Sequence, residues 1–165
     1  MRILGVDSGS RVTGYGVIEV RGSNYTFIDC GAIRMRPSML LPDRLKIIHQ
    51  SLVEVIEQHS PDVAVFESVF HAVNPQSALK LGHVRGVSML AAVQANLPVF
   101  EYSALQVKGA VTGYGRAEKS QVQQMVKSLL KLVKAPEPYD ASDALAVAIC
   151  HAQSYRYEKA TATNE

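Results

Sequence analysis

Four carboxylates stand where the sequence predicts that one structural element ends and another begins. Asp7 and Glu67 each follow a short apolar run, whereas Asp140 and Asp143 open a helical stretch. Neighbouring strands end close together in a sheet, and a helix can begin beside them, so we expect the four side chains to converge. Converging carboxylates repel one another unless a cation lies between them, and hard oxygen ligands suit Mg²⁺ or Mn²⁺.

Such a set of acids can hold two divalent ions about 4 Å apart, which activate a water and stabilise the leaving oxygen of a phosphodiester. Asp7 is the expected bridging ligand because its strand is predicted to be central in the sheet. Asp140 and Asp143 are three residues apart on a helix and therefore share a face. Packing of that helix on the sheet brings its first turn towards Asp7 and Glu67.

Each acid also has a simpler interpretation. Asp7 precedes a glycine turn and is compatible with an ordinary turn former. Glu67 at a strand end is compatible with a solvated side chain. Asp140 is compatible with a helix N-cap and Asp143 with the favourable field of a first helical turn, and either role can coexist with metal binding.

The composition indicates a compact globular protein. The chain has 165 residues, enough for one domain with a real core, and 47% of them are hydrophobic against 19% charged. The formal net charge of +2 does not by itself indicate nucleic acid. Two well-separated cysteines, Cys30 and Cys150, and the absence of a leader or long apolar segment predict a reduced, cytoplasmic location.

The distribution of charge is more informative than its sum. Residues 106–134 carry six cations and one acid. A basic sector beside an acidic pocket fits an enzyme that acts on a polyanion, and it fits equally well a solvated, lysine-rich helix face. The six cations are Lys108, Arg116, Lys119, Lys127, Lys131 and Lys134.

The predicted elements form a mixed, five-stranded sheet flanked by helices. Strands are expected at 2–6, 14–20, 25–33, 63–66 and 97–102, and helices at 42–59, 76–95, 104–108, 117–132 and 141–154. Residues 1–154 are predicted to form a single domain and residues 155–165 a frayed, polar tail. Three strands that open the chain, two of them joined as a hairpin, favour a ribonuclease H-like arrangement over a dinucleotide-binding one.

Five blocks of sequence, in order, resemble the RuvC family of bacterial crossover junction endodeoxyribonucleases. The first block contains Gly5-Val6-Asp7-Ser8-Gly9, and the last contains Asp140-Ala141-Ser142-Asp143. The similarity covers residues 1–152. The blocks are residues 5–16, 67–70, 74–82, 114–122 and 140–146.

The resemblance implies a ribonuclease H-like α/β fold, a homodimer, and Mg²⁺-dependent resolution of four-way (Holliday) junctions by paired nicks in recombination and repair. It places Asp7, Glu67, Asp140 and Asp143 as metal ligands, with two Mg²⁺ ions and Mn²⁺ as a substitute. It also implies a RuvA–RuvB complex as partner. Ser8 departs from the family, which more often has proline there.

The resemblance also assigns DNA contacts. Lys119 and Lys108 are implied at the DNA and near the active site, with Lys119 among the catalytic residues. Phe70 matches an aromatic side chain that stacks on bases near the crossover. Without the resemblance, both lysines are equally compatible with ordinary surface residues, and Phe70 with packing. We further expect Lys80, Arg85 and Arg116 to contact DNA.

The predicted helix 76–95 carries Gly82 and Gly86 four residues apart among apolar side chains. Small residues at this spacing allow another helix to approach closely, or allow the helix to pack on its own sheet. Two symmetric cuts in a junction need two identical sites, which an isologous dimer supplies. We therefore expect this helix to pair with its copy.

Two other classes of function compete with a nuclease. An actin-like ATPase or sugar kinase also opens with a strand and an Asp-x-Gly loop, but it needs two such domains. A junction-binding protein without catalysis needs no acids, and gathering four unused carboxylates costs stability. Neither alternative accounts for the full set of acids.

Overall fold

The computed structural model describes residues 1–68 and 74–157, and the backbone alone of residues 158–162. Five strands and five helices fall within these ranges. They are β1 (Arg2–Asp7), β2 (Val12–Arg21), β3 (Asn24–Arg34), α1 (Leu41–His59), β4 (Val63–Ser68), α2 (Pro75–Gln94), β5 (Val99–Ser103), α3 (Ala104–Thr112), α4 (Lys119–Leu129) and α5 (Tyr139–Ala162).

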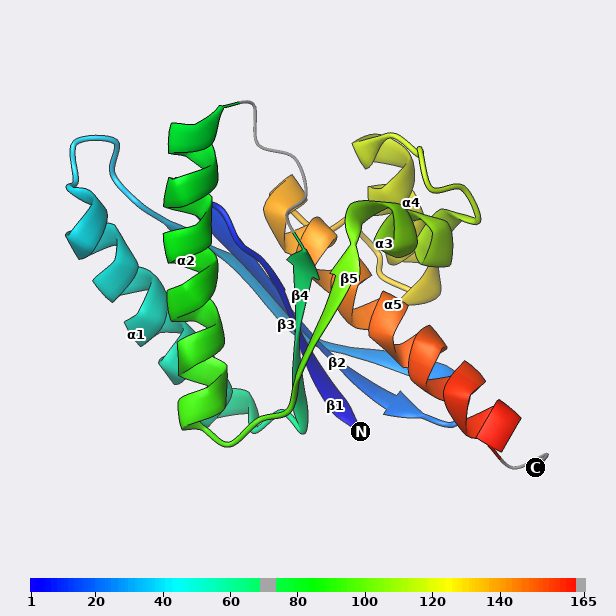
Figure 1. Ribbon diagram of the computed structural model, residues 1–165. Helices are drawn as coiled ribbons and strands as arrows, with labels where there is room; N and C mark the ends of the chain where they lie inside the picture. The colour runs from blue at the N-terminus through cyan, green and yellow to red at the C-terminus, as the bar shows by residue number, and fades with distance from the viewer. Residues whose placement is uncertain (69–73, 163–165) are drawn as a thin grey trace.

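The strands form one mixed sheet in the order β3-β2-β1-β4-β5. The first three strands run antiparallel to one another, and β4 and β5 run parallel to β1. Helices α1 and α2 cover one face of the sheet, and α3, α4 and α5 cover the other (Figure 1). The predicted mixed five-stranded sheet, with β1 in its centre, is confirmed.

A hydrophobic core lies on each side of this sheet because β1 and β4 are buried on both faces. Ile3 and Val65 pack towards α3, α4 and α5, whereas Leu4 and Phe66 pack towards α1 and α2. The alternation of faces along each strand therefore builds both cores at once. The sheet is held between two helical layers, and its strand ends remain accessible.

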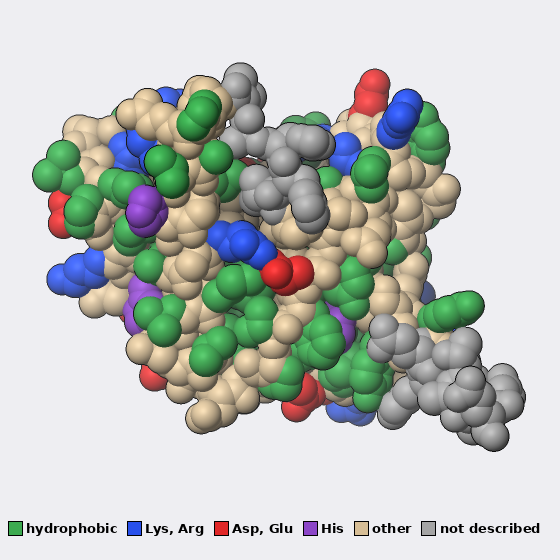
Figure 2. Space-filling view, viewed as in Figure 1, with side chains coloured by type: hydrophobic (Ala, Val, Ile, Leu, Met, Phe, Trp, Pro, Cys, Tyr) green, Lys and Arg blue, Asp and Glu red, His purple; other side chains and the backbone are tan. Residues whose placement is uncertain are grey.

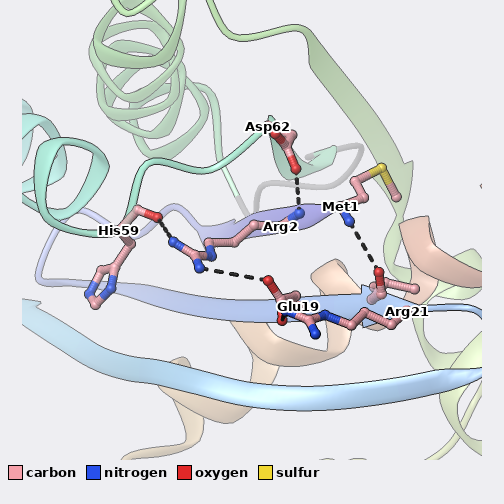
Figure 3. Close-up of polar contacts among 7 residues, drawn as sticks. Met1, Arg2, Glu19, Arg21, His59 and Asp62 are labelled. Atoms are coloured by element: carbon pink, nitrogen blue, oxygen red, sulfur yellow. Dashed lines mark hydrogen bonds and ion pairs between the residues drawn. The ribbon is translucent and has the colours of Figure 1, made fainter.

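Polar contacts fix the first residues of β1, at the opposite end of the strand from Asp7 (Figure 3). The backbone N–H of Arg2 donates to Asp62 Oδ2 at 2.6 Å, and its guanidinium donates to the carbonyl oxygen of His59. The same guanidinium lies 3.7 Å from Glu19 on β2. Because these partners come from β2 and from the segment before β4, the central strand is anchored in register at its start.

Helix α5 lies unusually close to the sheet because glycines face it. An added Cβ at Gly5 would overlap the carbonyl oxygen of Ala144, and one at Gly14 would overlap the carbonyl oxygen of Asp140. At Gly16 the nearest atom to an added Cβ would be Leu145 Cγ at 2.6 Å. Three strand glycines thus form a trough, here called the glycine trough, in which the backbone of α5 rests.

The helix boundaries differ from the sequence prediction in three places. Helix α3 extends to Thr112, where Gly113 ends it with a φ of 76°. Helix α4 is shorter than predicted and ends at Leu129, before Lys131 adopts a φ of 54°. Helix α5 continues to Ala162 because no glycine or proline interrupts it after Ser154, although its polar pattern predicted a frayed tail.

The glycine trough gives a first prediction. Gly5→Ala should lower the free energy of unfolding by about 1–3 kcal/mol or more, because the new methyl group overlaps the backbone of α5. Urea unfolding monitored by circular dichroism measures the change. Gly109→Ala on α3 is the matched control: the nearest atom to an added Cβ there is the backbone nitrogen of Gly115 at 4.0 Å, and alanine is the better helix former. Equal stabilities for the two variants would contradict the close approach.

Candidate active site

Three of the four predicted acids line one cavity at the carboxyl end of β1. Asp7 ends β1, Glu67 lies in the parallel neighbour β4, and Asp143 projects from α5. Lys108 from α3 and Lys119 from α4 line the same cavity, which has a volume of about 180 Å³. Five charged side chains from five different elements therefore meet in one small space.

The sequence places each of these side chains by a local device. Strands β1 and β4 pair with Val6 opposite Phe66, so Asp7 and Glu67 follow at the same edge. Ser103 caps α3 by accepting a hydrogen bond from the backbone N–H of Gln106, which orients Lys108 one turn further on. The side chain of Gln121 accepts from the backbone N–H of Glu118, which fixes the start of α4 and therefore Lys119.

Asp140 lies one helical turn before Asp143 and does not line the cavity. Its carbonyl oxygen rests over Gly14 on β2. It lies within α5, whose first residue is Tyr139, so the structure does not place it at the N-cap. Asp140 still acts on the site through its charge, because it raises the pKa of Asp7 and of Lys119.

Burial and mutual repulsion perturb the acids of the cavity. Burial, followed by the charges of Glu67 and Asp143, raises the pKa of Asp7 from 3.8 to about 7. Burial and the charge of Asp143 raise the pKa of Glu67 as well. The cavity therefore carries more negative charge than its own cations neutralise.

Lys119 is the cation in direct contact with an acid of this cavity. Its Nζ donates a hydrogen bond of 2.8 Å to Asp143 Oδ2, and this bond is the main cause of its raised pKa. The lysine side chain is 63% exposed, whereas that of Asp143 is 16% exposed. Lys119 can therefore contact the acids from one side and solvent, or a bound polyanion, from the other.

The carboxylate oxygens of the cavity are ligands that fit a hard divalent cation, although their spacing is not that of a metal-binding site. Within residues 1–68 and 74–157, no three His, Cys, Asp or Glu side chains are spaced to hold an ion. One oxygen of Asp143 is instead bound to Lys119. Asp7 with a pKa of about 7 nevertheless indicates a deficit of positive charge beside oxygen ligands, which a divalent cation would remove.

The other residues predicted to bind DNA are more widely spread. Lys80 is exposed on α2, and Arg116 is exposed just before α4. Arg85 on α2 forms an ion pair with Glu101 on β5. Phe70 lies outside the described residues. Only Lys108 and Lys119 of this set line the cavity with the acids.

Two features near the site were not anticipated from the sequence. Ser8 and Ser142, which follow Asp7 and precede Asp143, are buried, and neither Oγ has a hydrogen-bond partner within the described part of the chain. The positioning role of the glycine trough was also missed. Glycines at positions 5, 14 and 16 within strands were the available signal, because strand interiors otherwise disfavour glycine.

Comparison with known proteins defines the class. The family model for crossover junction endodeoxyribonuclease RuvC matches residues 3–151. The structure of Thermus thermophilus RuvC in complex with a Holliday junction substrate superimposes with a TM-score of 0.90 at 33% identity, covering 96% of each chain. The yeast mitochondrial Holliday junction resolvase Ydc2 shares the fold, with a TM-score of 0.66 at 15% identity over 99% of this chain and 84% of Ydc2.

Curated relatives lead to the particular family. The crossover junction endodeoxyribonuclease RuvC of Syntrophotalea carbinolica is 56% identical over 155 residues, which cover 94% of this chain and 96% of that protein. That of Pelotomaculum thermopropionicum is 49% identical over 159 residues, which cover 96% and 97% of the two chains. The chain belongs to the RuvC family, so the predicted family and its nuclease class are confirmed. Nucleases of this family depend on a divalent metal.

The raised pKa of Asp7 gives a second prediction. In the folded protein Asp7 keeps its proton up to a pH of about 7, whereas the unfolded chain loses it near 3.8. In the presence of a chelator, the free energy of unfolding should therefore fall as the pH rises through this window, by ~1–4 kcal/mol. Urea unfolding at several pH values measures the slope.

Variants separate this effect from general acid sensitivity. Asp7→Asn removes the titrating group and should flatten the slope while raising stability at pH ~8 without metal. Glu57→Gln, at an exposed position on α1, should leave the slope unchanged. A slope that persists in Asp7→Asn would assign the effect to other groups.

Proposed function

We propose that this protein resolves four-way (Holliday) DNA junctions by paired symmetric nicks, through two-metal hydrolysis of a phosphodiester, in recombination and repair. The observation that carries the proposal is the shared cavity of Asp7, Glu67 and Asp143 with two lysines. Membership of a family of junction endonucleases supports it. The junction-bound Thermus relative, which this chain resembles over most of its length, supports the choice of substrate.

In this proposal Asp7, Glu67, Asp140 and Asp143 hold two Mg²⁺ ions, with Mn²⁺ as a substitute. When bound, the metal supplies an activated water and stabilises the leaving oxygen. The charges of Glu67 and Asp143 both raise the pKa of Asp7, so a cation held by Asp7 would also be close to these two acids. Asp140, one turn before Asp143 on α5, would complete the set.

The lysines serve the phosphate in this mechanism. Lys119 reaches solvent and lies against Asp143, so its ammonium can stabilise negative charge on the phosphate next to the acids. Lys108 lines the same cavity and has the same role from α3. Arg116 and Lys80 extend the basic surface for DNA, with Phe70 stacking on a base near the crossover. Arg85 takes part by exchanging Glu101 for a backbone phosphate.

We also propose that the protein acts as a homodimer through α2. Hydrophobic side chains gather over the part of the surface where α2 and β5 lie (Figure 2). An apolar groove on α2 includes Gly82 and Gly86, and an added Cβ at either would meet nothing within 4 Å. These glycines therefore do not pack on their own sheet. A second copy of the helix can approach closely at these two glycines, and the symmetry of the dimer supplies the second cut.

We also propose domain bounds, a cellular location and a partner for the protein. The nuclease domain comprises residues 1–154, and α5 continues beyond it to Ala162. No helix within the described residues is long and apolar enough to span a membrane. We place the protein in the cytoplasm, where a RuvA–RuvB complex is its proposed partner.

Cleavage of a labelled four-way junction tests the proposed activity. With Mg²⁺ the protein should make paired symmetric nicks in the junction and leave plain duplex intact. Asp7→Asn should abolish cutting and retain junction binding, whereas Lys119→Ala should slow cutting by ~100-fold or more. Glu57→Gln is the control and should cut normally. Tight binding without cutting by the intact protein would favour the non-catalytic binder, and nucleotide hydrolysis without DNA would favour the kinase.

The dimer surface has its own test. Gly82→Leu places a branched side chain in the α2 groove and should convert a dimer into a monomer, measured as mass in solution by light scattering. Gln124→Leu adds the same side chain at an exposed position of α4, on the other face of the sheet, and should remain dimeric. An unchanged dimer in Gly82→Leu would reject α2 as the interface.

A further inference from the structure

Two arginines lie at the end of β3, which the strand order places on the other side of Asp7 from β5 and Lys108. Strand β2 pairs Gly14 with Asp7 of β1, and two residues further towards this end of the sheet β2 pairs Val12 with Arg34 of β3. The backbone N–H of Met35 donates to the carbonyl oxygen of Arg11 at 3.0 Å. Arg34 and Arg36, here called the arginine strip, alternate with the buried Met35 at the end of β3 and therefore lie on the same face of the chain. Arg11 is opposite Met35 and lies on the other face.

A fourth arginine holds the backbone of this strip in place. The guanidinium of Arg44 donates to the carbonyl oxygens of Met39 at 2.9 Å, Pro37 at 2.7 Å and Ser10 at 3.3 Å. These bonds tie the segment after β3 to the loop that follows Asp7. These hydrogen bonds from Arg44 to main-chain oxygens therefore link the strip to the catalytic strand. Support of this kind holds a binding site in a fixed position.

The two arginines of the strip have no acidic partner. Both are exposed, and no Asp or Glu within residues 1–68 and 74–157 forms an ion pair with either of them. Arg2, Arg21 and Arg85, by contrast, each pair with a glutamate. Unneutralised guanidinium groups gathered at one edge attract an anion, and they repel one another without it.

The strip also adjoins the start of α5. Ile33 and Met35 are buried, so Arg34 projects from the opposite side of its strand, towards α4 and α5. It lines an open cavity of about 410 Å³ with Gln123, Glu137, Pro138 and Tyr139. Tyr139 is exposed and directly precedes Asp140. Gln123 lies one turn after Lys119 on α4, so this cavity is close to that lysine. The strand order places it on the other side of Asp7 from β5 and Lys108.

We propose that the arginine strip is a second phosphate-binding site, which holds the DNA backbone on the far side of the scissile phosphate. This inference rests on the proposed nuclease function. Guanidinium groups bind phosphate oxygens through paired hydrogen bonds, so they fix position as well as charge. A strand bound by Lys108 on one side of Asp7 and by the strip on the other crosses the acids between two fixed points. Tyr139 offers a stacking surface beside that path.

Binding of a four-way junction in the presence of a chelator tests the strip without cleavage. The double variant Arg34→Ala/Arg36→Ala should bind roughly tenfold more weakly at about 100 mM salt, and the dependence of log Kd on log salt should become shallower by about two. Arg156→Ala is the matched control. It removes the same charge from an exposed position beside Met1 and Val20, at the opposite edge of the sheet, and should bind within about twofold of the parent.

A second measurement uses the unaltered protein. Phenylglyoxal modifies exposed arginines, and mass spectrometry should show that junction DNA protects Arg34 and Arg36 but leaves Arg156 reactive. Binding and protection that match the control would overturn the arginine strip while the parent still binds and cuts junctions. A parent protein that neither binds nor cuts junctions would overturn the proposed function itself, so the two failures are distinguishable.

Discussion

The contact of α5 with the glycine trough is the constraint on which the rest of the site depends. Gly5 and Gly14 leave no space for a side chain, so the helix backbone lies directly over the two central strands. Asp143, one turn into this helix, is thereby brought into the cavity of Asp7. A helix at ordinary packing distance would hold its first turn further from the sheet, and Asp143 would lie outside the cavity of Asp7.

Bringing these acids together lowers the stability of the folded protein and serves the proposed reaction. The pKa of Asp7 rises to about 7 because burial and two neighbouring carboxylates disfavour its charge. Lys119 offsets part of this repulsion through its bond to Asp143, and the same lysine is aimed at the phosphate in the proposed mechanism. The site is therefore a region where stability is exchanged for function, which is common in enzymes.

The end of the sheet that carries the acids presents charges in a pattern that suits a long polyanion. Lys108 and Lys119 line the acidic cavity from α3 and α4, and the arginine strip lies at the end of β3. The ends of the central strands lie between Lys108 and the strip. An extended substrate that spans this end of the sheet contacts cations on both sides and acids in the middle, whereas a small substrate would use one side only.

The sequence by itself determined the sheet, its mixed order and the candidate acids, because strand patterns and the residues that end strands are local properties. It also placed Lys119 at the start of a helix. Tertiary structure alone decided that Asp140 stays outside the cavity and that α5 reaches the sheet at backbone distance. It also decided that Arg34 lies at the same end of the sheet as Asp7, since that position depends on the pairing of β2 with β3. These outcomes depend on the register of strands and the depth of a helix contact, which no local pattern encodes.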